Sequence, residues 1–266
     1  MADAVFRNLA KRKLEAGELV LCMGLRQARS ADIPMVAAAA GFDCVYVDME
    51  HGPASLESCS TLCVGAFAAG ITPLVRVPGH DVNLANRALD GGALGVIFPH
   101  VDTAEEASRL AAACRFPPLG HRSVIGSGVT LGYRALPLGA VNAVGNAETL
   151  IIVMLETPSG IANAEAIAAT EGVDVLLIGA NDLSTEMGIP GEWRHPRLRE
   201  AFAAAAAACR KHRRVLGVGG VSGDLDLQRE LYRMGGTFMI AGSDTGYLMS
   251  AARADVSALR HATTDT

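Results

Sequence analysis

The chain has 266 residues, half of them hydrophobic, and a formal net charge of -5 at pH 7. A chain of this length and composition can bury one barrel-sized core. Its charges are spread along the sequence, which argues against a nucleic-acid-binding surface. The longest apolar run is shorter than the ~20 residues that a membrane span needs, so a membrane partner is not expected either.

Cysteine usage and the start of the chain indicate a cytoplasmic protein. The six cysteines include no C-x-x-C pair and no zinc-ligand spacing, and most of them lie in apolar segments. Such thiols are expected to stay reduced, as they do in the cytoplasm. The first residues show no signal-peptide pattern.

Apolar runs alternate with amphipathic segments along most of the chain. We expect strands at residues 19–23, 43–47, 72–75, 94–98, 150–155, 173–178, 215–218 and 237–240. We expect helices at residues 4–15, 31–40, 55–69, 81–90, 103–114, 159–169, 195–212, 225–234 and 243–261. Eight strands in alternation with helices predict a closed parallel α/β barrel, the (β/α)₈ or TIM barrel, as a single domain over residues 1–266. An open doubly wound sheet is the structural alternative.

Residues 117–146 interrupt this alternation with a proline pair and several glycines. We expect a long loop there, and loops of that length inside a compact domain usually serve function or an interface. His121 and Arg122 lie in this segment. They either reach the substrate or hold the loop in place.

Ionisable side chains follow several of the predicted strands, at the point where each strand ends. These residues are Asp48, Glu50, His51, Arg76, Glu156 and Asp182. The carboxyl ends of parallel strands meet at one mouth of a barrel, so we expect these groups to converge. Because burying a charge alone is costly, such a cluster predicts a metal, a substrate or ion pairs.

Each member of the cluster suggests a role. Glu156 and Asp182 resemble a metal pair for a hard cation, Mg²⁺ or Mn²⁺, although either carboxylate could instead support a neighbouring group or cap a helix. Arg76 suits a carboxylate or an oxygen that gains negative charge, or else a plain ion pair. His51 is the natural proton carrier. Its candidate partners are Asp48 and, if its helix or another subunit brings it close, Asp90.

Other motifs are weak or missing. The sequence has no Walker motif and no G-x-S-x-G elbow. Since no predicted strand ends in Lys, a Schiff-base mechanism lacks its residue. The pattern therefore favours a metal over an imine as the electron sink.

Six short motifs occur in a specific order and spacing. They are Val-Asp-Met-Glu-His-Gly-Pro (47–53), Pro-Leu-Val-Arg-Val-Pro (73–78), Ala-Leu-Asp-Gly-Gly-Ala (88–93), Pro-His-Val-Asp-Thr-Ala-Glu-Glu-Ala (99–107), Val-Met-Leu-Glu-Thr-Pro-Ser-Gly (153–160) and Gly-Val-Asp-Val-Leu-Leu-Ile-Gly-Ala-Asn-Asp-Leu-Ser (172–184). With them the chain resembles the HpcH/HpaI family of metal-dependent class II aldolases, from about Phe6 to Leu248.

The resemblance implies a role for each matching residue. His51 would be the acid/base residue, supported by Asp48 and by Asp90, the latter reached within the chain or from another subunit. Arg76 would stabilise an enolate, and Glu156 and Asp182 would bind the metal. The backbone of Gly179, Ala180 and Asn181 would receive the pyruvate carboxylate. Met154 stands where the characterised aldolases have a substrate-contacting Gln, so we expect an altered substrate preference.

The resemblance also implies the reaction and the assembly. The expected reaction is cleavage or formation of a 4-hydroxy-2-oxo acid, giving pyruvate, or a related 2-oxo acid, and an aldehyde through an enolate. The cofactor would be Mg²⁺ or Mn²⁺, with Co²⁺ or Zn²⁺ as alternatives. A homo-oligomer, commonly a hexamer, would exchange its last helix between subunits. Related carbon–carbon lyases (an acyl-CoA lyase or an oxaloacetate decarboxylase) and a non-catalytic barrel that binds a 2-oxo acid remain alternatives.

Overall fold

The protein, described here by a computed structural model over residues 7–264, contains a closed barrel of eight parallel strands in chain order. They are β1 (Val20–Leu25), β2 (Cys44–Asp48), β3 (Thr72–Arg76), β4 (Gly95–Phe98), β5 (Leu150–Leu155), β6 (Val175–Gly179), β7 (Val215–Gly219) and β8 (Gly236–Ser243). Because β8 also pairs with β1, the sheet has no free edge. The predicted (β/α)₈ barrel is confirmed.

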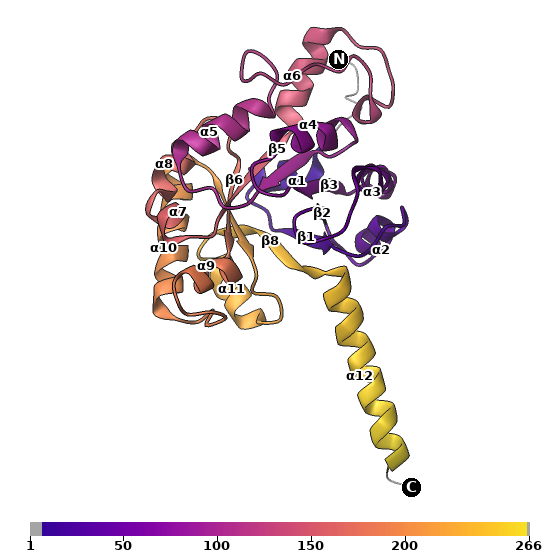
Figure 1. The fold of residues 1–266 in the computed structure, drawn as a ribbon, viewed down its shortest axis with the longest axis vertical. Coiled ribbons are helices and arrows are strands. Elements are labelled where there is room, and N and C mark those ends of the chain that lie inside the picture. Colours follow the sequence, from indigo (N-terminus) through magenta and orange to yellow (C-terminus); the bar gives the residue numbers. More distant parts are fainter. Residues whose placement is uncertain (1–6, 265–266) are drawn as a thin grey trace.

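Helices surround the barrel, as Figure 1 shows. They are α1 (Leu9–Glu15), α2 (Ile33–Ala39), α3 (Leu56–Ala69), α4 (Val82–Asp90), α5 (Ala104–Ala113), α6 (Leu138–Glu148), α7 (Pro158–Ala162), α8 (Ala164–Ala169), α9 (Ala180–Glu186), α10 (Pro196–His212), α11 (Leu225–Arg233) and α12 (Asp244–Thr264), with one 3₁₀ turn at Val129–Leu131. In contrast to the others, α12 projects away from the barrel.

Three expectations about the helices need correction. The helix expected at residues 159–169 is broken at Asn163 into α7 and α8. The loop expected at 117–146 is not structureless, because its second half forms the 3₁₀ turn and α6. The first helix begins at Leu9 after an Asn8 cap, and residues 4–6 of that prediction lie outside the described part of the chain.

The strands are buried on both faces, and their alternation decides what enters the barrel. Tyr46 of β2 belongs to a cluster inside the barrel, which also includes Leu74 and Ile152. Its neighbours Val45 and Val47 belong to the larger cluster that the strands share with the surrounding helices. Every second residue of a strand therefore points inward.

The same alternation aims the polar strand ends at the mouth of the barrel. Asp48 lies two residues after Tyr46, and Arg76 lies two residues after Leu74. Glu156 likewise lies two residues after the inward-facing Met154. In addition, the β2–β3 register places Asp48 directly opposite Arg76. The sheet geometry alone thus brings these groups to one place.

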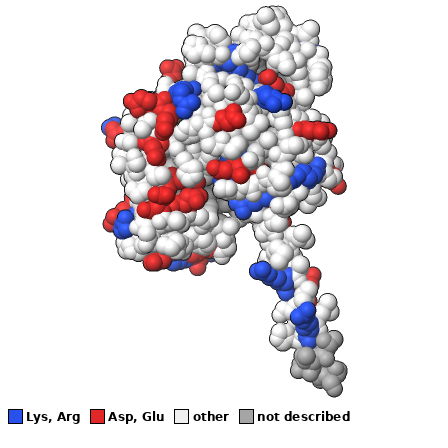
Figure 2. Space-filling model, viewed as in Figure 1, with Lys and Arg blue, Asp and Glu red and all other residues white. Residues whose placement is uncertain are grey.

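The surface matches the composition. Figure 2 shows acidic and basic side chains interspersed over one face of the molecule. None of the helices in the described residues is both long enough and apolar enough to span a membrane.

A buried asparagine closes the amino-terminal end of the barrel. Asn8 is fully buried, and its side-chain amide donates to the carbonyls of Leu94 and Glu148, each at 2.9 Å. Its side-chain oxygen accepts from the Lys11 backbone at 2.9 Å and from the Thr72 hydroxyl at 3.2 Å. This one side chain joins α1 to β3, to the start of β4 and to the end of α6.

Replacing Asn8 with Ala should lower the free energy of unfolding by about 2–4 kcal/mol, because several buried backbone groups lose their partner. Urea unfolding followed by circular dichroism measures this change. Asn83→Ala, at an exposed position on α4, is the matched control and should change stability little. Equal effects of the two substitutions would contradict the role given to Asn8.

Candidate active site at the mouth of the barrel

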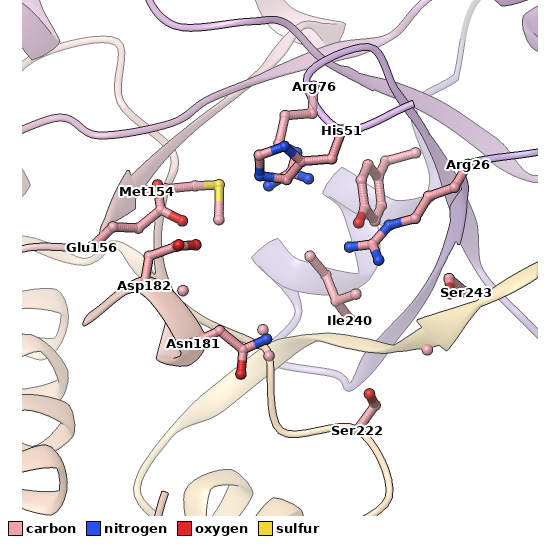
Figure 3. A pocket seen from close by; sticks show the side chains of 15 residues that line it. Arg26, His51, Arg76, Met154, Glu156, Asn181, Asp182, Ser222, Ile240 and Ser243 are labelled. Carbon is pink, nitrogen blue, oxygen red and sulfur yellow. The ribbon is translucent and has the colours of Figure 1, made fainter. Parts of the chain in front are cut away.

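A cavity of about 310 Å³ opens at the carboxyl ends of the strands. Its lining includes Arg26, His51, Arg76, Met154, Glu156, Gly179, Asn181 and Asp182. Figure 3 shows Glu156 and Asp182 on one wall, His51 and Arg76 above them, and Arg26 on the opposite side. Residues from the ends of five strands (β1, β2, β3, β5 and β6) thus meet in one hollow, as the sequence predicted for a barrel.

Asp48 is the anchor of this arrangement. Its side chain is inaccessible to solvent, and Arg76 donates to both of its oxygens, at 3.1 and 2.6 Å. The same carboxylate accepts from Arg26 Nε at 3.2 Å and from the backbone N–H of His51 at 3.0 Å. Burial on its own would raise the pKa of Asp48, but the hydrogen bonds and charge of Arg76 outweigh it and lower that pKa.

Arg76 is a fixed cation at the edge of the cavity. Besides Asp48, it contacts Glu50, whose carboxylate lies 3.1 Å from Nη1. Burial disfavours its charge, but the neighbouring acids raise the pKa of Arg76 overall. The guanidinium therefore stays charged, and its orientation is set by two carboxylates on β2 and the turn that follows.

Glu156 and Asp182 form a carboxylate pair on the opposite side from Arg26 (Figure 3). Glu156 is almost completely buried and accepts from the His100 backbone N–H at 3.0 Å. Burial raises the pKa of Glu156 to about 7, and the nearby charge of Asp182 adds to the shift. Two such acids in one site favour a cation between them or beside them.

The cap role considered for Asp182 is not what the structure contains. Helix α9 begins at Ala180, and no side chain caps it at Gly179. Asp182 lies within the first turn and lines the cavity. The side-chain oxygen of Asn181 accepts from the indole N–H of Trp193 at 3.1 Å, which fixes the start of this helix. Ala180 is fully buried and is not among the residues that line the cavity.

Gly179 is required by the position of Glu156. A Cβ at residue 179 would lie only 2.4 Å from Glu156 Oε1, so no side chain fits without moving the carboxylate. Met154, two residues before Glu156, lines the floor of the cavity and is nearly buried. A thioether at this position offers an apolar contact in place of a hydrogen-bond donor.

His51 lies on the turn after β2, with more than half of its side chain exposed. Its Nε2 is 3.8 Å from the Glu50 carboxylate, whereas Asp48 holds only its backbone N–H. Asp90, the other expected partner, pairs with Arg122 at 2.7 Å at the end of α4 and does not line the cavity. Within one chain, the acid nearest to the imidazole is therefore Glu50.

The sequence placed Glu50 in the cluster of strand ends but indicated no role for it, and it gave no site role to Arg26 or His100. Arg26 comes directly after β1, and Arg76 is the last residue of β3, so the same strand-end signal was present. His100 follows β4, and its ring Nδ1 lies 3.5 Å from Glu156. Arg122 packs over the Phe116 ring, 4.7 Å from its centre, and so helps to hold the 117–146 segment in place.

Replacing Asp48 with Asn should lower the free energy of unfolding by about 3–5 kcal/mol at neutral pH, because the buried Arg76 cation loses its main partner. The pKa of Asp48 is lowered in the folded protein. The contribution of the Asp48 charge to the free energy of unfolding is therefore complete above the ordinary pKa of 3.8. It disappears as the pH falls through the lower pKa that Asp48 has in the folded protein. The stability gap between wild type and variant should accordingly narrow below about pH 4.

Urea unfolding across the acidic range measures this gap. Asp226→Asn, at an exposed position on α11, is the control. If the difference in free energy of unfolding between wild type and Asp48→Asn stays constant down to the lowest pH measured, the charge of Asp48 does not contribute to stability.

Comparison with known proteins places this chain in a family. The HpcH/HpaI aldolase/citrate lyase family matches residues 25–251. The chain is 40% identical to a 4-hydroxy-4-methyl-2-oxoglutarate aldolase of Chaetomium globosum, over 94% of this chain and 93% of the relative. It is 32% identical to a 5-keto-4-deoxy-D-glucarate aldolase of Klebsiella pneumoniae, over 94% and 96%.

Solved structures agree with the sequence comparison. The HpcH/HpaI aldolase of Desulfitobacterium hafniense DCB-2 superposes with a TM-score of 0.91 at 28% identity, covering 96% of this chain and 97% of the other. The resemblance seen in the sequence motifs is confirmed. The chain belongs to the HpcH/HpaI aldolase/citrate lyase family.

Proposed function

We propose that this protein is a class II aldolase that cleaves 4-hydroxy-2-oxo acids into pyruvate, or a related 2-oxo acid, and an aldehyde or ketone. The observation that carries the proposal is the meeting of the Glu156–Asp182 pair, Arg76 and His51 in one cavity. The chemistry fits, since a carbon–carbon lyase of this kind needs a proton carrier and a stabiliser for an oxyanion. The two relatives named above are aldolases of 2-oxo acids.

The residues present fit a divalent metal cofactor. The described residues contain no group of three or more His, Cys, Asp and Glu side chains arranged around a metal. Mg²⁺ and Mn²⁺ nevertheless often use one or two carboxylates and complete their shell with water and substrate oxygens. Glu156 and Asp182 would hold such an ion. Burial raises the pKa of Glu156 to about 7, so a cation beside it would stabilise the charged form of this carboxylate. When bound, the cation supplies Lewis-acid polarisation of the substrate's keto group.

The remaining steps belong to side chains of this chain. His51 takes the proton from the C4 hydroxyl, directly or through water, and the C3–C4 bond breaks. The bonding electrons move to the C2 oxygen, where Arg76 stabilises the enolate charge. A proton then returns to C3 and completes pyruvate. Gly179, Ala180 and Asn181 border the place of the 2-oxo acid carboxylate, and Met154 forms the apolar floor.

We further propose that the working protein is a cytoplasmic homo-oligomer, with a hexamer as the expected form. Helix α12 projects from the barrel with exposed apolar side chains, among them Leu248, Val256 and Leu259. An isolated helix with such side chains gains stability from packing against another subunit. Asp90 would serve His51 only in such an assembly. All six cysteines are free and buried, in keeping with a reducing compartment.

The central test is pyruvate release from 4-hydroxy-2-oxo acids, followed with a coupled assay. Activity should disappear in EDTA and return with Mg²⁺ or Mn²⁺. His51→Ala should reduce kcat by about 10²- to 10⁴-fold, the usual contribution of general acid–base catalysis. His121→Ala, at an exposed position outside the cavity, is the matched control. Full turnover in EDTA would refute the proposed metal dependence. Full activity of His51→Ala would refute the assignment of His51 as the proton carrier.

Replacing Gly179 with Ala tests the metal position separately. The added methyl would collide with Glu156, so Mn²⁺ affinity in isothermal titration should fall by about 10- to 100-fold, as for other displaced ligands. Gly139→Ala in α6 adds the same methyl where nothing lies within 4 Å, and it should bind Mn²⁺ like wild type. Unchanged affinity in Gly179→Ala would remove Glu156 from the metal site.

A further inference from the structure

Arg26 and Arg76 are the two cations among the described residues that line the cavity, and their surroundings differ. Arg76 is buried and held by two carboxylates, Asp48 and Glu50. Arg26 has 43% of its side chain exposed and contacts Asp48 through Nε alone, at 3.2 Å. That single bond orients the guanidinium and turns its forked end toward the cavity (Figure 3).

The backbone that carries Arg26 is also fixed. The Asp244 carboxylate accepts the N–H groups of Arg26 at 3.1 Å, Gln27 at 2.9 Å and Ala28 at 2.7 Å. Burial works against the Asp244 charge, but these backbone bonds outweigh it and lower the pKa of that carboxyl. A half-exposed arginine usually loses affinity through the entropy of its own side chain. Here both ends of the residue are restrained before any ligand binds.

Position decides which part of a ligand Arg26 meets. The Glu156–Asp182 pair, where the 2-oxo acid end is assigned, lies across the cavity from Arg26 (Figure 3). A group that reaches Arg26 therefore belongs to the other fragment, beyond the C4 carbon. Ser222 and Ser243 lie on this side as well and offer hydroxyl groups.

We propose that Arg26 binds a carboxylate carried by the carbonyl fragment, so that the preferred substrates are 4-hydroxy-2-oxo acids with a second carboxylate beyond C4. This inference rests on the proposed aldolase function. A planar guanidinium with a free fork matches a carboxylate in a bidentate geometry. One arginine with no lysine beside it in the lining suits a singly charged carboxylate better than a doubly charged phosphate.

The experiment compares two substrates that differ only at this point. In 4-hydroxy-2-oxoglutarate a carboxylate occupies the place that a methyl group occupies in 4-hydroxy-2-oxopentanoate. The readout is the ratio of kcat/KM for the first to kcat/KM for the second. In Arg26→Ala this ratio should fall by about 10- to 100-fold, the effect of losing a hydrogen bond to a charged group.

Companion variants separate binding from folding. Arg26→Lys keeps the charge and should recover part of the ratio, whereas Arg26→Gln keeps a polar side chain and should not. Arg26→Gln also replaces Arg26→Ala if the latter does not fold. Arg29→Ala removes a neighbouring cation that donates to the Arg26 and Ala28 carbonyls, and it should keep the wild-type ratio.

Each other outcome overturns a specific statement. If Arg26→Ala and Arg26→Gln reduce both substrates in proportion, Arg26 acts through Asp48, and the carboxylate assignment is wrong. If the ratio is unchanged, Arg26 does not contact the fragment. If a phosphate in the same place is preferred to the carboxylate, the ligand class is wrong. If the wild-type protein turns over neither compound, the proposed aldolase function is wrong. This outcome is seen without any variant, so it is distinct from a failure of the Arg26 proposal.

Discussion

The carboxylate of Asp48 lies out of reach of solvent, between two guanidinium groups and two backbone N–H groups. A buried charge is stable only when it is paired and hydrogen-bonded, so the removal of any partner affects the others. Arg76 is fixed by this acid, Arg26 is oriented by it, and the turn that carries His51 folds back on it. The positions of Arg76, Arg26 and His51 in the cavity therefore depend on the side chain of Asp48.

The cavity has two walls of different origin. On one side, β5 and β6 deliver Glu156 and, through α9, Asp182. On the other, β1 and the turn after it deliver Arg26. In the proposed reaction the acidic wall would hold a cation and the 2-oxo acid, and the basic wall would face the carbonyl fragment. A barrel makes this division simple, because each strand end can change its side chain without disturbing the next.

Much of this was predictable from the sequence, for a physical reason. Buried strands appear in the sequence as apolar runs. A charged residue directly after such a run, as at Arg76 or Glu156, is therefore expected at the mouth of the barrel, where the strand ends. Pairing between side chains was not predictable, since it depends on rotamers and on segments far apart in the chain. Asp90 pairs with Arg122, and Glu50 is the acid nearest to His51. Helix α6 lies in a segment where glycine and proline predicted an open loop.

Asp244 connects two parts of the structure, and this role is separate from its charge. It closes the segment that carries Arg26, and it is also the first residue of the projecting helix α12. Packing of α12 against another subunit, as proposed above, would therefore also restrain the backbone that carries the Arg26 guanidinium. The proposed contact between subunits and the proposed choice of substrate would thus depend on the same residue.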